Sequence, residues 1–229
     1  MRVGQPHKRE SNLLRPKVLT QDLTSSSSVV LAERLLATLV LPVVALFLLP
    51  LGLLIVLDSP GKALFVQERV GLHGRLFKMF KLRTMQVGSE DAHERLQAIA
   101  LEKTGMPFIY PEMDERITRL GRTLRKTRLD ELPQLVNVAL GHMSLVGPRP
   151  MLPSELIHVP EFMKYRFTLR PGVTGPVQLS GHLGRDWEHL RSLEEAFFSK
   201  SQSQNVRRPD SFDNWNSGEN SHTYRDETN

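Results

Sequence analysis

Two adjacent carboxylates, Asp130 and Glu131, are the side chains best suited to chemistry in this sequence. Pro133 follows them, and because proline is tolerated in the first turn of a helix, a helix should begin near residues 130–132. The helix dipole stabilises negative charge at that end, and its free N–H groups can bind phosphate. Paired carboxylates also suit Mg²⁺, which takes one or two carboxylates together with substrate oxygens. An ionised Asp can also attack phosphorus and form an aspartyl phosphate.

A simpler interpretation is that Asp130 only caps the helix. The surrounding cations favour a chemical role for Asp130, because cations keep a carboxylate ionised and bind phosphoryl oxygens. These cations are Arg125, Lys126 and Arg128 just upstream, Lys81 and Arg83 in a second basic cluster, and Arg149 downstream.

Arg149 lies in the loop GPRP, residues 147–150. Pro148 and Pro150 could simply fix a rigid turn with the arginine in solvent. Alternatively, the loop is preorganised and holds an anionic or nucleotide ligand through the arginine fork. The sequence alone leaves both interpretations open.

Composition and missing motifs exclude several classes of protein. The 229 residues include 30 Lys and Arg against 25 Asp and Glu, with 40% hydrophobic residues, which excludes collagen-like, fully disordered and coiled-coil chains. The lack of cysteine excludes disulfides, thiol nucleophiles and cysteine-based metal sites. No P-loop, zinc-protease or nucleophile-elbow motif occurs. The basic charge gathers near an apolar run, so we expect anionic membrane lipid or phosphate as partner, and no nucleic acid.

That apolar run, residues 35–57, holds 23 residues without a charge. It exceeds the roughly 18 residues that indicate a membrane segment, and it lacks the polar face of a soluble surface helix. A signal peptide is disfavoured because a long polar stretch precedes the run. Pro42 and Pro50 predict a bend, so the helix either spans with a kink or is re-entrant. Basic residues on both flanks favour the re-entrant form, because positively charged flanks stay in the cytoplasm.

We expect a chain that is mainly α with a small β element. A disordered polar segment at 1–28 precedes a re-entrant membrane helix at 29–57, a catalytic domain at 58–198 and a polar disordered tail at 199–229. Residues 63–70 are typical of a strand, and 75–85 of a strand or a helix. Helices are predicted within 89–112 and around 161–167. A basic amphipathic helix over 116–126 suits a membrane surface, with a solvated helix face as the alternative.

Three motifs in fixed order carry a resemblance to a known family. The chain contains FLLPLGLLIVLDSPGKALFVQERVGLHGRLFKMFKLRTM, then RITRLGRTLRKTRLDELPQLVNVALGHMSLVGPRP, then RPGVTGPVQLSG. Together they resemble the bacterial sugar transferases known as small monotopic polyprenyl-phosphate phosphoglycosyl transferases, over residues 32–198. The chain departs from the family's usual start of the membrane helix, where it has Glu33, Arg34 and, three residues later, Ala37.

The resemblance implies a role for each matching residue. Asp130 would be the nucleophile that forms a covalent phospho-sugar intermediate, and Glu131 would support it and a bound Mg²⁺. The loop Pro148, Arg149 and Pro150 would lie near the nucleotide, and Pro50 would break the membrane helix. Lys81, Arg83 and Arg125 match basic positions suited to phosphate.

The resemblance also implies a reaction at the cytoplasmic face of the bacterial inner membrane. A phospho-sugar would pass from a UDP-sugar to polyprenyl phosphate, releasing UMP and priming synthesis of exopolysaccharide, O-antigen, capsule or another glycan. Downstream glycosyltransferases would take the product. Two alternatives stay open: a catalytically weak relative that is a membrane-bound partner in polysaccharide assembly, and a non-enzymatic basic membrane protein.

Overall fold

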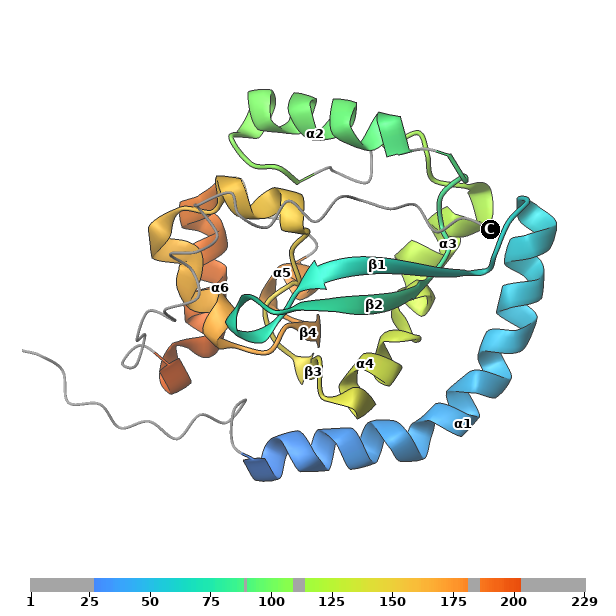
Figure 1. Cartoon of the computed structure of the whole chain (residues 1–229), viewed down its shortest axis with the longest axis horizontal. Coiled ribbons are helices and arrows are strands. Elements are labelled where there is room, and N and C mark those ends of the chain that lie inside the picture. The colour runs from blue at the N-terminus through green and yellow to red at the C-terminus, as the bar shows by residue number, and fades with distance from the viewer. Residues whose placement is uncertain (1–26, 89, 109–113, 181–185, 203–229) are drawn as a thin grey trace, which may run out of the picture.

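The structure is a computed structural model, and it describes residues 27–88, 90–108, 114–180 and 186–202. The predicted disordered segments lie almost entirely outside these ranges. Within them the chain is mainly helical, with two small two-stranded sheets, which confirms the prediction of a mainly α chain with a small β element (Figure 1).

The apolar run forms one long helix, α1 (Ser27–Asp58), of 32 residues with Pro42 and Pro50 inside it. In the described part of the chain it is the one helix long and apolar enough to cross a membrane. Its apolar side chains are largely exposed, for example Leu39 at 76% and Leu57 at 73%. Figure 1 shows α1 as a bent helix that passes along two sides of the other elements. Proline within a helix is a common cause of such a bend.

The segment after α1 forms an antiparallel hairpin of β1 (Leu64–Val70) and β2 (Leu76–Leu82). The predicted strand at 63–70 is confirmed, and the ambiguous segment 75–85 proves to be a strand. The short 3₁₀ turn η1 (Leu72–Gly74) joins them, with His73 and Gly74 at positive φ. β2 carries Lys81 next to its end and so brings this cation into the middle of the domain.

A second sheet joins the loop GPRP to the segment RPGVTG. Its strands, β3 (Ser144–Val146) and β4 (Gly172–Thr174), are parallel. The Gly147 N–H donates to Thr174 O at 2.9 Å, and the Gly172 N–H donates to Pro148 O at 2.9 Å. A Cβ on Gly172 would lie 2.0 Å from the Gly147 nitrogen, so only glycine permits this close approach. The two motifs therefore form one structural unit.

Five shorter helices complete the described fold: α2 (Glu90–Thr104), α3 (Arg119–Thr127), α4 (Gln134–Leu140), α5 (Pro176–Ser180) and α6 (Trp187–Gln202). The helix expected at 116–126 begins later, because the Thr118 hydroxyl caps it by accepting from the Gly121 N–H at 2.9 Å. The helix expected around 161–167 consists of 3₁₀ turns, η5 (Glu161–Thr168), and another 3₁₀ segment, η4 (Pro153–His158), precedes it.

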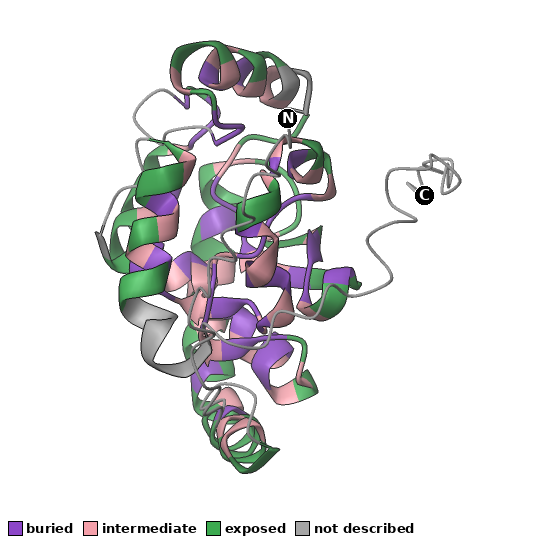
Figure 2. Ribbon diagram, turned by 90° about the vertical axis from the view of Figure 1, so that its left-hand side faces the viewer, coloured by how far each residue is buried: buried purple, intermediate pink, exposed green. Residues whose placement is uncertain are grey.

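Buried side chains form three apolar clusters between these elements, and exposed positions dominate the outer surfaces (Figure 2). The largest cluster contains Met151, Met163 and Leu190 and joins the GPRP region to η5 and α6. The other two include residues of α1: Ala37 packs with α4 and β2, and Ile55 packs with β2 and α3. Both halves of the apolar helix are therefore attached to the same domain.

Candidate active site

Asp130 and Glu131 lie in a 3₁₀ turn, η3 (Leu129–Glu131), between α3 and α4. The α-helix itself begins at Gln134, so the predicted helix start near 130–132 corresponds to this turn. Arg128, at φ 58°, ends α3 in the left-handed conformation and turns the chain into η3. Asp130 is 6% exposed, whereas Glu131 reaches Lys81 of β2 with a 3.3 Å contact between Oε1 and Nζ. The structure thus brings both carboxylates and Lys81 together.

The electrostatics around Asp130 combine burial with nearby charge. Burial raises the pKa of Asp130, and the Glu131 carboxylate adds to the rise, while Lys81 and Arg125 oppose it. Burial likewise lowers the pKa of Lys81, and Glu131 counteracts this while the charges of Arg69 and Arg149 add to it. Each buried group therefore depends on an oppositely charged neighbour to remain ionised, which is a common property of active sites.

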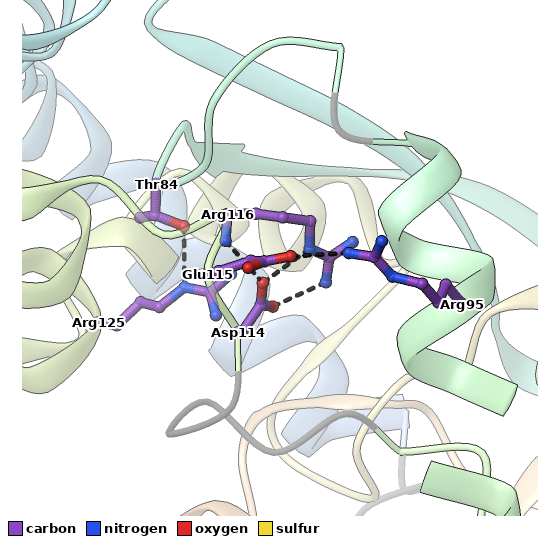
Figure 3. Close-up of polar contacts among 6 residues, drawn as sticks. All are labelled: Thr84, Arg95, Asp114, Glu115, Arg116 and Arg125. Atoms are coloured by element: carbon purple, nitrogen blue, oxygen red, sulfur yellow. Dashed lines mark hydrogen bonds and ion pairs between the residues drawn. The ribbon is translucent and has the colours of Figure 1, made fainter. Parts of the chain in front are cut away.

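Arg125 reaches this region from α3, where its Nε donates to Thr84 Oγ1 at 2.9 Å (Figure 3). Beside it lies a buried pair in which Arg116 donates from Nε and Nη2 to the two carboxylate oxygens of Asp114, both at 2.7 Å. Burial lowers the pKa of Arg125, and the carboxylates Asp130 and Asp114 oppose this shift. Arg116, predicted on the basic helix, is instead part of this buried pair.

A pocket opens next to the two carboxylates, Asp130 and Glu131. Its lining joins β1, β2, η3, α4, the GPRP loop, β4 and α5, and consists of Arg69, Met79, Lys81, Glu131, Gln134, Arg149, Pro150, Gly172, Val173 and Gln178. Asp130 is not part of this lining and adjoins it through Glu131. Arg69 donates to Pro150 O at 3.2 Å and to Gln67 Oε1 at 2.7 Å. Burial, together with the charge of Arg149, lowers the pKa of Arg69 to about 10.

Three lining residues carry buried polar atoms without a partner among the described residues: Arg69 Nε, Arg149 Nε and Gln178 Oε1. Buried polar atoms are normally hydrogen-bonded, because an unpaired one loses its hydration without compensation. A ligand that offers acceptors to the arginines and a donor to the glutamine would satisfy all three. The pocket therefore suits an anion that also carries N–H or O–H groups.

Arg83 lies outside the pocket lining and is bound at the end of the apolar helix. Its guanidinium donates to the carbonyl oxygens of Ile55, Ser59, Pro60, Gly61 and Lys62 and to the Ser59 hydroxyl, at 2.7 to 3.3 Å. These carbonyls lie at the end of α1 and just beyond it, where helical partners run out. Arg83 therefore caps the C-terminus of the apolar helix, and its predicted role beside phosphate stays a prediction.

Of the remaining predicted residues, two line the pocket, one supports its loop and one lies in α1. Arg149 and Pro150 line the pocket, whereas Pro148 holds the loop through its carbonyl bond to Gly172. Pro50 lies within α1 and outside the pocket lining. Sequence reasoning missed Arg69 and Gln178, although both stand in the quoted motifs.

The acidic groups at this site fit a metal shared with a substrate. The described residues contain no cluster of three or more His, Asp or Glu side chains that could enclose an ion. Asp130 and Glu131 supply two carboxylates at most, which is the number that Mg²⁺ takes when phosphate oxygens and water complete its shell. The donor set fits Mg²⁺ held jointly with a phosphate ligand.

Comparison with known proteins gives consistent matches. A family model described as bacterial sugar transferase matches residues 26–203. The exopolysaccharide production protein PSS of Rhizobium leguminosarum bv. phaseoli is 44% identical over 151 residues, which cover 62% of this chain and 68% of the relative. The UDP-glucose:undecaprenyl-phosphate glucose-1-phosphate transferase of Caulobacter vibrioides is 40% identical over 188 residues, which cover 80% of this chain and 60% of the relative.

A third relative is much longer than this chain. The galactosyl transferase CpsE of Streptococcus agalactiae serotype III is 40% identical over 167 residues, 72% of this chain. The chain spans 36% of the length of that protein. The residues matched by the family model, 26–203, include Asp130, Glu131, the β1–β2 hairpin and the GPRP loop described above.

Proposed function

The chain belongs to the bacterial sugar transferase family, and on that premise we propose that it moves a sugar phosphate from a UDP-sugar to a polyprenyl phosphate. The products would be a polyprenyl diphosphate sugar and UMP, as the primer of a polysaccharide. The name of the Caulobacter relative, a UDP-glucose:undecaprenyl-phosphate glucose-1-phosphate transferase, supports this substrate class. The observation that carries the proposal is the buried Asp130 next to a pocket with unsatisfied arginine donors.

The transfer divides into two displacements at one phosphorus atom. First, a carboxylate oxygen of Asp130 attacks the sugar-bearing phosphorus, and the bond from that phosphorus to the bridging oxygen breaks, so UMP leaves with the electron pair. Second, a phosphate oxygen of the polyprenyl carrier attacks the same phosphorus and releases the carboxylate. Both steps are phosphoryl transfers, in which positioning and charge neutralisation do most of the work.

The basic side chains supply that neutralisation. Lys81 acts on both Asp130 and Glu131, so it keeps the nucleophile ionised while adding positive charge next to the pocket. Arg69 and Arg149 offer free Nε donors to the diphosphate of the donor substrate. Asp130 and Glu131 would hold Mg²⁺, whose charge would further neutralise the phosphate oxygens.

The attachment of α1 supports a re-entrant arrangement. Near its start, Glu33 accepts from Ser144 Oγ at 2.6 Å, and Arg34 Nε donates to Ala139 O at 3.0 Å. Near its end, Arg83 holds the carbonyls of Ile55 and Ser59. Because one domain binds both ends, we place both on one side of the bilayer, and the basic flanks make that side the cytoplasm of a bacterial inner membrane.

This topology would bring two unlike substrates together. The polyprenyl chain is apolar and stays in the bilayer, whereas the UDP-sugar is charged and arrives from water. A helix that enters and returns on one side keeps the domain against the membrane surface, where anionic lipid would face its basic residues. Downstream glycosyltransferases would then extend the product on the same face.

UMP release tests the proposal. The purified protein in lipid nanodiscs is given undecaprenyl phosphate, Mg²⁺ and a panel of UDP-sugars. We expect UMP from at least one donor and a loss of about 1,000-fold or more in Asp130→Asn, as for removal of a nucleophile. Glu115→Gln, an exposed carboxylate whose side chain is 71% accessible and pairs with Arg95, is the matched control and should stay near wild type.

The opposite results are equally informative. Full turnover in Asp130→Asn would refute Asp130 as the nucleophile. A folded, membrane-bound protein that releases no UMP from any donor would instead favour a non-catalytic partner in polysaccharide assembly.

A further inference from the structure

Helix α6 is linked to the GPRP loop through two residues outside the helix, Arg166 and Phe108, and we propose that α6 positions Arg149 at the pocket. This inference rests on the proposed function, because the position of Arg149 matters only if the pocket binds the donor substrate. Glu194 and Trp187 of α6 would be positioning residues, since neither lines the pocket.

The first route runs through a buried ion pair to the loop backbone. Arg166 Nη2 donates to Glu194 Oε1 at 2.9 Å and to the carbonyl oxygen of Arg149 at 3.2 Å. The Tyr165 hydroxyl donates to the other oxygen of Glu194 at 3.0 Å. The Arg166 and Glu194 side chains are 3% and 0% exposed, so their charges depend on each other. Glu194 therefore fixes Arg166, and Arg166 fixes the loop.

The second route runs through aromatic rings to the guanidinium. The Arg149 guanidinium carbon lies 5.9 Å from the centre of the Phe108 ring, a cation–π contact. The Trp187 ring meets Phe108 edge-on, with 5.6 Å between the ring centres. Phe108 belongs to the same apolar cluster as Met151 and Leu190, so the ring has a fixed support. Helix α6 thus supports both the main chain and the side chain of Arg149 through these intermediate residues.

Such support is needed because the pocket holds like charges close together. Arg69 and Arg149 both line it, and each has a buried Nε without a partner among the described residues. Left free, Arg149 would turn toward water and leave the pocket. A network that holds Arg149 in place before the ligand arrives lowers the entropy that binding must overcome. Loss of the network should therefore weaken donor binding more than the chemical step.

The test compares neighbouring carboxylates on α6. Glu194→Gln removes the buried charge, whereas Glu195→Gln removes an exposed charge that pairs with Arg191 on the same helix. We expect Glu194→Gln to raise KM for the UDP-sugar about tenfold with kcat changed less than about threefold, the signature of lost binding. Glu195→Gln should change neither constant by more than about twofold.

A double-mutant cycle separates positioning from general damage. In an Arg149→Ala background, Glu194→Gln should raise KM by less than about twofold more, because the residue that it positions is gone. Fully additive effects would overturn the inference. If Glu194→Gln does not fold, Tyr165→Phe and Trp187→Phe weaken the two routes more mildly and enter the same cycle.

Hydrogen exchange tests the positioning without turnover. In Glu194→Gln, the amides of Gly147, Arg149 and Met151 should exchange at least about threefold faster than in the wild type, while those of the β1–β2 hairpin keep their rates. If no UDP-sugar is turned over and the loop still loosens, the proposed function fails but α6 still positions Arg149. Unchanged exchange of the loop would refute the role of α6.

Discussion

Arginines occupy two regions of this molecule that differ in how their donors are used. At the end of α1, the guanidinium of Arg83 donates to carbonyl oxygens of Ile55 and the residues that follow α1, as well as to a hydroxyl. At the pocket, Arg69 and Arg149 each keep a buried Nε without a partner among the described residues. A satisfied cation holds the fold together, whereas a buried cation with a free donor is available to a ligand.

The contrast is sharpest between Lys81 and Arg83, which are two residues apart. Lys81 points to Glu131 and lines the pocket, while Arg83 binds the end of the apolar helix. Each of the following predictions tests whether the two regions are separable, one as a structural support and the other as a binding site.

The largest effect should come from the structural region. Arg83→Ala removes a buried guanidinium that donates to several carbonyl oxygens at and after the end of α1, so we expect a loss of about 3 kcal/mol or more in the free energy of unfolding. Thermal unfolding in nanodiscs, followed by circular dichroism, measures this loss. Arg83→Lys should recover only part of it, because an ammonium lacks the planar fork that reaches several oxygens. A stable Arg83→Ala variant with specific loss of donor binding would place Arg83 in the site after all.

Lys81→Met should give the reverse pattern. It keeps the length of the side chain but removes the charge next to Asp130 and Glu131, so we expect about 100-fold lower kcat/KM in UMP release. Thermal stability should change by less than about 1 kcal/mol, because Lys81 forms a half-buried ion pair with Glu131. Its exposed neighbour on the strand gives the control, since Lys78→Met should leave the activity near wild type. Equal losses in both variants would refute a specific role for Lys81.

Activity should increase with pH on the acidic side and decrease on the alkaline side, because Asp130 and Lys81 must both be charged. Burial raises the pKa of Asp130 above 3.8, so activity should increase as pH rises through that pKa and the nucleophile ionises. Burial lowers the pKa of Lys81 below 10.5, so activity should decrease as pH rises through that value and the cation is lost. Lys81→Arg should abolish the alkaline decrease, which a kcat/KM profile against pH would detect. An unchanged alkaline limb would assign it to another group.

A smaller effect is expected from Arg69→Lys. The positive charge stays, but the Nε donor and the planar fork are lost, so we expect about tenfold weaker binding of the donor substrate. Product inhibition by UMP measures this without the chemical step. Arg75→Lys, a basic residue in the hairpin turn outside the pocket lining, provides the control. Equal inhibition constants for wild type and Arg69→Lys would show that the free donor of Arg69 does not meet the ligand.

The sequence predicted the parts of this arrangement that depend on local pattern. The apolar run, the strand at 63–70 and a helical segment that begins close to residues 130–132 follow from periodicity, charge and proline placement. The different roles of Lys81 and Arg83 could not be predicted from local pattern, because both are basic residues close to the end of the same strand. Their roles depend on partners far along the chain: Glu131 lies 50 residues from Lys81, and Ser59 lies 24 residues from Arg83.

The missed residues have the same explanation. Arg69 meets Pro150 across 81 positions, and no local pattern marks it in VQERVG. Gln178 becomes notable only once its Oε1 is seen to be buried without a partner among the described residues. In contrast, Glu33 stood out as a departure from the family pattern, and the structure gives it a role, because it accepts from the Ser144 hydroxyl and so attaches α1 to β3.

The most direct test of the account is a search for the covalent intermediate on Asp130. The protein is incubated with its UDP-sugar in the absence of polyprenyl phosphate and analysed by intact-protein and peptide mass spectrometry. We predict a sugar-phosphate adduct on Asp130 that forms as UMP is released, disappears when polyprenyl phosphate is added, and is missing in Asp130→Asn. Turnover that proceeds with no adduct, or with an adduct on another residue, would contradict the proposed two-step transfer.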